Sequence, residues 1–174
     1  DSLFPSLQQQ VSAAERIRAI NTALARPGPD GDGQLAYHLL MARAKEMYYQ
    51  GLYDRGIADV NRSLELATAV NDSLLIATAY NMFGLLNENL GDDAVTLPWF
   101  RTAERWLPRS TECPYPVVKD YHIHGNIAQC LLNLGRHDSA AFHFRRSLQQ
   151  AQQAGNLRAQ ALANLGLAGT ALAM

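Results

Sequence analysis

Tyr80-Asn-Met-Phe-Gly84-Leu-Leu-Asn-Glu-Asn-Leu-Gly91 is the stretch that decides the fold of this chain. Its apolar residues recur at helical spacing around one small residue, Gly84, and Gly91 ends the segment. Glycine is suited to that end because it takes up the left-handed backbone conformation at little cost. Phe100 and Ala103 follow at the spacing of a second helix. The stretch therefore predicts two helices joined by a short turn.

The same pattern occurs around three further small residues. Ala44, Gly84, Ala128 and Gly166 are separated by 40, 44 and 38 residues. In the first three copies, a glycine follows after 7 residues, a larger apolar residue after 16 and a small one after 19. Small residues let two helices cross closely, while the larger ones fill the space beside them. Helix pairs of this kind must stack, because one pair cannot bury both of its faces.

The predicted fold is all-α, with about eight helices forming a right-handed α-solenoid of antiparallel pairs. Residues 1–33 are expected to form an N-terminal capping helix, over about 6–26, and a loop. Residues 34–174 are expected to form the array, whose units are 34–72, 73–114, 115–156 and an incomplete 157–174. Asp54 and Asp138 are expected to cap second helices.

Composition argues against several classes of function. The 174 residues include 15 basic and 16 acidic ones, with a formal net charge of −1, so there is no basic excess for nucleic acid or an anionic membrane surface. Hydrophobic residues make up 48%, enough for a sizeable core. No signal peptide or apolar span of about 20 residues is present, and we expect no membrane insertion by residues 1–174. The chain begins at Asp1, so we expect a mature or excised piece of a longer protein.

The repeat resembles the tetratricopeptide repeat family over roughly residues 34–174. The residues that match the family pattern best are Tyr80, Phe83, Gly84, Phe100 and Ala103, with Pro108 at its terminal proline. The units are longer than the usual ~34 residues, which is similar to the tetratricopeptide regions of kinesin light chains and of large bacterial regulators. Arg43 departs from the pattern, because an apolar residue is expected just before the small one. Either the packing of the first unit is altered, or Arg43 reaches solvent past the capping helix.

A second resemblance concerns Asp1-Ser2-Leu3, followed by a helix and stacked pairs. It is similar to the part after the signal peptide in Bacteroidetes-type signalling proteins, where a tetratricopeptide array precedes a membrane span and a histidine kinase or DNA-binding output. These resemblances imply a protein- or peptide-binding module without catalytic activity of its own, the sensory or scaffolding part of a larger bacterial signalling protein. The alternative is an intramolecular array that regulates an enzyme domain, such as a kinase, beyond the C-terminus. The implied location is periplasmic, with the cytoplasm as the alternative.

Stacked first helices should line a concave groove that binds an extended peptide. The resemblance implies that asparagines hold the peptide, and an asparagine offers a donor and an acceptor to a backbone amide. Asn126 and Asn164 occupy equivalent positions, two before the small residue, and Asn81 is one position off. The predicted groove residues are Asn126, Asn164, Asn81, Gln129, Asn133, Lys45, His38 and His122. The alternative is a solvated polar face or a hydrogen bond between helices.

The sequence predicts no metal, cofactor or catalytic site. His122 and His124 lie two residues apart, so they point to different sides of a helix. Adding Cys113, Cys130 or His143 to either requires a geometry that the sequence does not define. Cys130 is expected to act as a small hydrophobe, with a bridge to Cys113 as the alternative. The acidic residues expected to be solvated or to cap helices are Glu46, Glu88, Asp92 and Asp93.

The last predicted helix is apolar around nearly its whole circumference. Such a helix should be buried, but its second-helix partner is absent from residues 157–174. We therefore expect an exposed apolar surface. A second copy of the chain that covered this surface would form a homodimer through residues 157–174.

Overall fold

Eight α-helices account for most of the described chain. The computed structural model describes residues 12–25, 33–89, 91–107 and 118–173, and no strand occurs in these ranges. The helices are α1 (Ala13–Leu24), α2 (Gly33–Tyr49), α3 (Tyr53–Ala69), α4 (Ser73–Glu88), α5 (Asp93–Trp106), α6 (Asp120–Asn133), α7 (His137–Gln153) and α8 (Leu157–Leu172). The all-α prediction is confirmed. The predicted start of the capping helix, and Pro108 and Cys113, lie outside the described residues.

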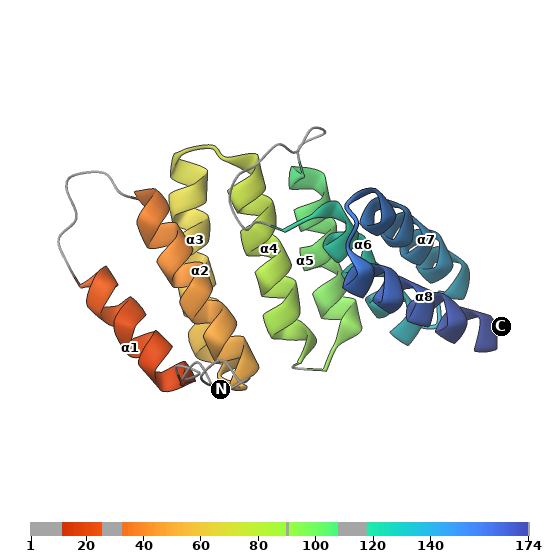
Figure 1. The fold of residues 1–174 in the computed structure, drawn as a ribbon, viewed down its shortest axis with the longest axis horizontal. Helices are drawn as coiled ribbons and strands as arrows, with labels where there is room; N and C mark the ends of the chain where they lie inside the picture. The colour runs from red at the N-terminus through yellow and green to blue at the C-terminus, as the bar shows by residue number, and fades with distance from the viewer. Residues whose placement is uncertain (1–11, 26–32, 90, 108–117, 174) are drawn as a thin grey trace, which may run out of the picture.

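The helices form one curved row of antiparallel pairs (Figure 1). Each helix packs against the next one along the chain, so α2–α3, α4–α5 and α6–α7 are pairs, with α1 and α8 at the two ends. In Figure 1, α2 to α5 stand nearly upright while α7 and α8 are tilted, so the row twists along its length. Contacts restricted to near neighbours in sequence are the defining property of a solenoid.

Glycines end several of the helices, as predicted, whereas two predicted aspartate caps do not begin theirs. The predicted stops Gly51, Gly91 and Gly135 all have left-handed backbones, with φ of 72°, 91° and 70°, where a side chain would be strained. The predicted caps at Asp54 and Asp138 are wrong, because the N-cap residues are Leu52 and Arg136, which places both aspartates inside the first turn. Their charges still suit the positive end of the helix dipole there.

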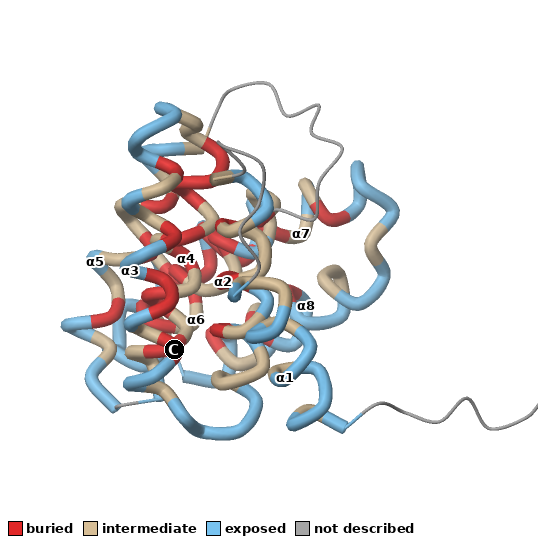
Figure 2. Tube along the Cα trace, turned by 90° about the vertical axis from the view of Figure 1, so that its left-hand side faces the viewer, coloured by how far each residue is buried: buried red, intermediate tan, exposed pale blue. Residues whose placement is uncertain are grey.

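The predicted close crossings occur at two glycines. A Cβ built at Gly84 would lie 2.2 Å from the ring of Phe100, and one built at Gly166 would lie 2.3 Å from the ring of Phe144. No side chain fits at such distances unless the ring moves. Ala44 is fully buried at the equivalent place. The buried residues of the row gather between its helices, while exposed ones cover the outside (Figure 2).

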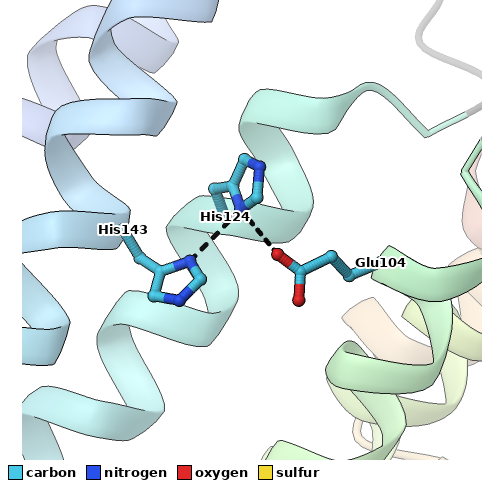
Figure 3. Close-up of side chains that lie close together, drawn as sticks. All are labelled: Glu104, His124 and His143. Atoms are coloured by element: carbon cyan, nitrogen blue, oxygen red, sulfur yellow. Dashed lines mark hydrogen bonds and ion pairs between the residues drawn. The ribbon is translucent and has the colours of Figure 1, made fainter. Parts of the chain in front are cut away.

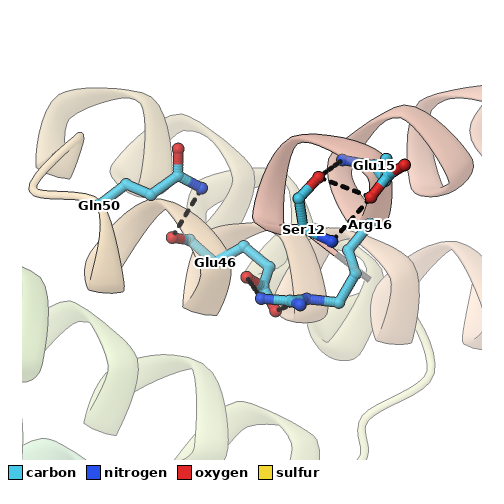
Figure 4. A network of polar contacts seen from close by, with 5 residues as sticks. All are labelled: Ser12, Glu15, Arg16, Glu46 and Gln50. Carbon is cyan, nitrogen blue, oxygen red and sulfur yellow. Dashed lines mark hydrogen bonds and ion pairs between the residues drawn. The ribbon is translucent and has the colours of Figure 1, made fainter. Parts of the chain in front are cut away.

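The first helix caps the array through polar contacts. None of its residues is buried. Ser12 and Glu15 form a capping box, in which the Ser12 N–H donates to Glu15 Oε2 at 2.8 Å and the Glu15 N–H donates to Ser12 Oγ at 3.2 Å (Figure 4). Arg16 donates to both carboxylate oxygens of Glu46 on α2, at 2.8 and 2.7 Å. Glu46 is therefore ion-paired rather than solvated, although an exposed ion pair contributes little to stability.

Arg43 forms an ion pair inside the first unit instead of reaching solvent past α1. Its Nε and one terminal nitrogen donate to the Asp59 carboxylate on α3, at 2.7 and 2.6 Å. The other terminal nitrogen donates to Asn21 Oδ1 on α1 at 2.5 Å. The Asp59 residue is only 6% exposed. The departure from the repeat at Arg43 thus alters the packing of the first unit by linking three helices.

The last helix has the exposed apolar surface that its sequence predicts. Leu162 and Leu165 are 59% and 71% exposed. In the preceding unit, the equivalent residues His124 and Ile127 are 2% and 0% exposed. Neither α8 nor any other described helix is long and apolar enough to cross a membrane.

Candidate functional site

The first helices of the pairs form the inner side of the row. Among the described residues, α2 contacts α4 and α6 contacts α8, whereas α3, α5 and α7 make no comparable contacts with one another. Elements approach each other most closely on the concave side of a curved stack. Side chains of α2, α4, α6 and α8 that point away from the second helices therefore face one groove.

Two of the predicted asparagines bind each other across this groove. Asn126 Nδ2 on α6 donates to Asn81 Oδ1 on α4 at 2.9 Å. Asn81 is only 7% exposed, while Asn126 is half-buried. This contact is the helix-to-helix hydrogen bond that the sequence left as an alternative. Because an amide has two N–H donors and an acceptor oxygen, the contact orients Asn126 and leaves it able to bind a ligand as well.

A cavity of about 530 Å³ lies between α6 and α8, beside Asn126. Its wall on α8 is apolar and includes Leu162, Leu165 and Leu172. Its polar edge on α6 includes Asn126 and Gln129. The volume is within the range of ligand-binding cavities, about 300–1,000 Å³. The arrangement places hydrogen-bonding groups directly next to space for an apolar group.

The structure divides the predicted groove residues into two groups. Asn126, Gln129 and His122 line the cavity together. Gln129 Nε2 donates to Asn133 Oδ1 at 2.8 Å, so Asn133 supports the cavity from outside it. Asn164 and Lys45 are exposed and His38 is half-buried. The predicted residues outside the cavity lining are His38, Lys45, Asn81, Asn133 and Asn164.

The charge at the cavity edge is set by His122 and Glu88. Partial burial lowers the pKa of His122, and the positive charges of Lys119 and Lys45 lower it further. Burial raises the pKa of Glu88, reinforced by Asp93, so Glu88 lines the cavity instead of being solvated as predicted. At neutral pH the polar edge on α6 is therefore uncharged.

A second group of polar side chains lies where α5, α6 and α7 meet, and we call Glu104, His124 and His143 the histidine cluster (Figure 3). His124 Nδ1 lies 3.2 Å from His143 Nδ1 and 3.4 Å from Glu104 Oε1. His124 and His143 are 2% and 5% exposed. Burial lowers the pKa of His124 to about 4 and also lowers that of His143, and the positive charges of Arg146 and Arg101 act in the same direction.

Residue spacing predicted neither the cavity nor the histidine cluster. Aligning the units places His124 and His143 where the second unit has Tyr80 and Trp99, whose rings stack at a centroid distance of 6.2 Å. Because Tyr80 and Trp99 contact each other, the equivalent positions of His124 and His143 could have predicted that the two histidines meet. The cavity depends on the angle at which α8 crosses α6, which no residue spacing reveals.

Comparison with known proteins supports the fold. No protein-family model matches this sequence, and no curated protein matches it. The crystal structure of MamA is similar to this chain, with a TM-score of 0.55 and 15% sequence identity over 92% of this chain and 89% of MamA. The described chain therefore has the fold of a tetratricopeptide-like α-solenoid of eight helices.

Proposed function

We propose that this chain is a protein-interaction module without catalytic activity, which binds an extended peptide segment in its concave groove. The observation that carries this proposal is the cavity between α6 and α8 with the oriented Asn126 amide at its edge. An extended peptide presents backbone amides and side chains at alternating positions. The cavity suits one apolar side chain of such a peptide, and Asn126 suits the adjoining backbone amide.

We further infer a role in a larger bacterial signalling protein, on the periplasmic side of the membrane. The resemblance of the N-terminal segment and the array to sensory regions of such proteins supports this inference. The alternative occupant of the groove is another segment of the same protein, through which the array would regulate an enzyme domain such as a kinase. Sequencing the gene on both sides of the coding region for residues 1–174 distinguishes these contexts.

Replacing Asn126 by alanine is expected to weaken peptide binding by about 1–3 kcal/mol, the cost of a lost buried hydrogen bond. The ligand is obtained by selecting a random peptide library displayed on phage against the chain, and its affinity is measured by titration calorimetry. Asn164→Ala is the matched control, because Asn164 is exposed and lies outside the cavity lining. We expect it to change the affinity by less than about 0.5 kcal/mol.

Asn126→Ala also removes the partner of the buried Asn81, so its fold must be checked by thermal unfolding. Leu162→Ala provides a second probe, since Leu162 lines the cavity and is largely exposed. If both variants bind the selected peptides as tightly as the unmodified chain does, the cavity is not the binding site.

We also propose that a second copy of the chain can cover the exposed leucines of α8 and form a homodimer. Two copies of an apolar helix can cover each other about a two-fold axis. Leu165→Asp should then convert a dimer to a monomer in sedimentation experiments, while Val95→Asp, at a 55% exposed residue of α5, should not. A chain that remains monomeric at about 1 mM, where even a millimolar Kd gives substantial association, would contradict this dimer.

A further inference from the structure

We propose that Glu104, His124 and His143 form a binding site for a divalent transition-metal ion of the zinc class. Three different helices supply the residues, and Figure 3 shows the three side chains turned toward one another. One nitrogen or oxygen atom from each lies within 4.8 Å of the other two. None of these three residues lines the cavity between α6 and α8, and the proposed site does not depend on peptide binding.

Two of the three distances between ligand atoms suit one small ion, and the third pair lies within 4.8 Å. Two ligand atoms, each about 2.1 Å from a tetrahedral zinc ion, lie about 3.4 Å apart. His124 Nδ1 is 3.2 Å from His143 Nδ1 and 3.4 Å from Glu104 Oε1. A neutral imidazole can carry its proton on Nε2, which frees each Nδ1 lone pair for the ion. Two imidazoles and a carboxylate form a known zinc ligand set, with water in the fourth position.

The cluster also places polar side chains at three positions that are apolar or aromatic in at least one other unit. His124 and His143 stand where the second unit packs Tyr80 against Trp99. Glu104 stands where the next unit has Leu148. The first unit has Leu40, Asp59 and Leu64 at these positions, so the position of His143 is polar there as well. No other unit has a histidine at any of the three, and packing does not require imidazoles. Buried polar side chains need polar partners. The two imidazoles contact each other at 3.2 Å, and one ion between them would accept a lone pair from both.

Neighbouring charges indicate how the ion would be held. Arg101 donates to Glu104 Oε2 at 3.1 Å, which leaves Oε1 directed toward His124. Arg101 and Arg146 both act electrostatically on the histidines, and their positive charges oppose a cation. The Glu104 side chain is 26% exposed, so the site is reached from solvent at the carboxylate. We therefore expect weaker binding than at closed structural zinc sites.

The test is a metal titration of the full chain after its metal has been removed with a chelator. We expect one zinc ion per chain by titration calorimetry, a higher Tm with zinc, and visible absorption bands of tetrahedral cobalt with cobalt chloride. Glu104→Gln and His143→Gln should each weaken zinc binding by about 100-fold or more, since even outer partners of metal ligands contribute 10–100-fold. The control His122→Gln removes a histidine of α6 outside the cluster and should bind zinc normally.

Three results would overturn the site. The first is the absence of zinc binding by the unmodified chain, and the second is equal affinity in Glu104→Gln and the unmodified chain. The third is a sulfur-to-cobalt charge-transfer band, which would show a cysteine ligand. Circular dichroism monitors the fold of each variant. Glu104→Gln keeps the shape of a side chain at the edge of the cluster, so it decides the question even if His143→Gln fails to fold.

Discussion

Replacing Phe100 by alanine is expected to lower the free energy of unfolding by about 3–5 kcal/mol. Phe100 is fully buried on α5, and its ring lies against Gly84 of α4. The cost of such a cavity depends on how well its surroundings collapse. Because Gly84 has no side chain to move into the vacated space, we expect a value in the upper half of this range. Chemical denaturation of the full chain measures it.

Phe142→Ala is the matched control. Phe142 lies on α7, another second helix, and is 56% exposed, so its replacement should cost less than about 1 kcal/mol. If Phe100→Ala and Phe142→Ala lower the free energy of unfolding equally, the close crossing of α4 and α5 is contradicted.

A double variant tests the Gly84–Phe100 contact directly. Gly84→Ala alone should destabilise the chain by about 1–3 kcal/mol, because its Cβ would lie 2.2 Å from the Phe100 ring. In a chain that already carries Phe100→Ala, the same change should stabilise it by up to about 1 kcal/mol through helix propensity. A loss of the same size in both backgrounds would show that the ring does not constrain position 84.

The fold could be predicted from the sequence because its determinants are local and repeated. Gly84 predicts one close helix crossing, and Gly91 and Gly135 each predict the end of one helix. The spacing that the units share predicts which helices pair. The errors also have local causes. Asp54 and Asp138 are good capping residues, but α3 and α7 begin two residues earlier than caps at those positions would give.

The site could be predicted only in part, because partners across units depend on the twist of the row. The sequence indicates that Asn126 faces the groove, but not that Asn81 on the preceding first helix would accept its hydrogen bond. Separating His122 from His124 by helical periodicity is sound. It says nothing of His143 and Glu104, which come from two other helices. A contact between three helices has no signature in the spacing of any one of them.

Replacing Arg43 by leucine is expected to lower the free energy of unfolding by about 2–4 kcal/mol, although leucine restores the apolar residue that the repeat favours. The substitution removes both hydrogen bonds to the Asp59 carboxylate, which is 6% exposed. A buried carboxylate without its partner is costly, whereas an apolar pair at the same place is often neutral or stabilising. The double variant Arg43→Leu/Asp59→Leu should therefore recover most of the stability that Arg43→Leu loses.

Arg62→Leu is the control for the loss of an arginine from an ion pair. Arg62 and Glu65 are both 64% exposed in their side chains, so breaking their contact should change the free energy of unfolding by less than about 0.5 kcal/mol. Chemical denaturation at equal ionic strength is measured for the unmodified chain, Arg43→Leu, Arg43→Leu/Asp59→Leu and Arg62→Leu. It compares the buried ion pair with the exposed one. If Arg43→Leu unfolds at the same denaturant concentration as Arg62→Leu, the Asp59 carboxylate is reached by water. In that case the contacts of Arg43 with α1 and α3 would contribute no measurable stability.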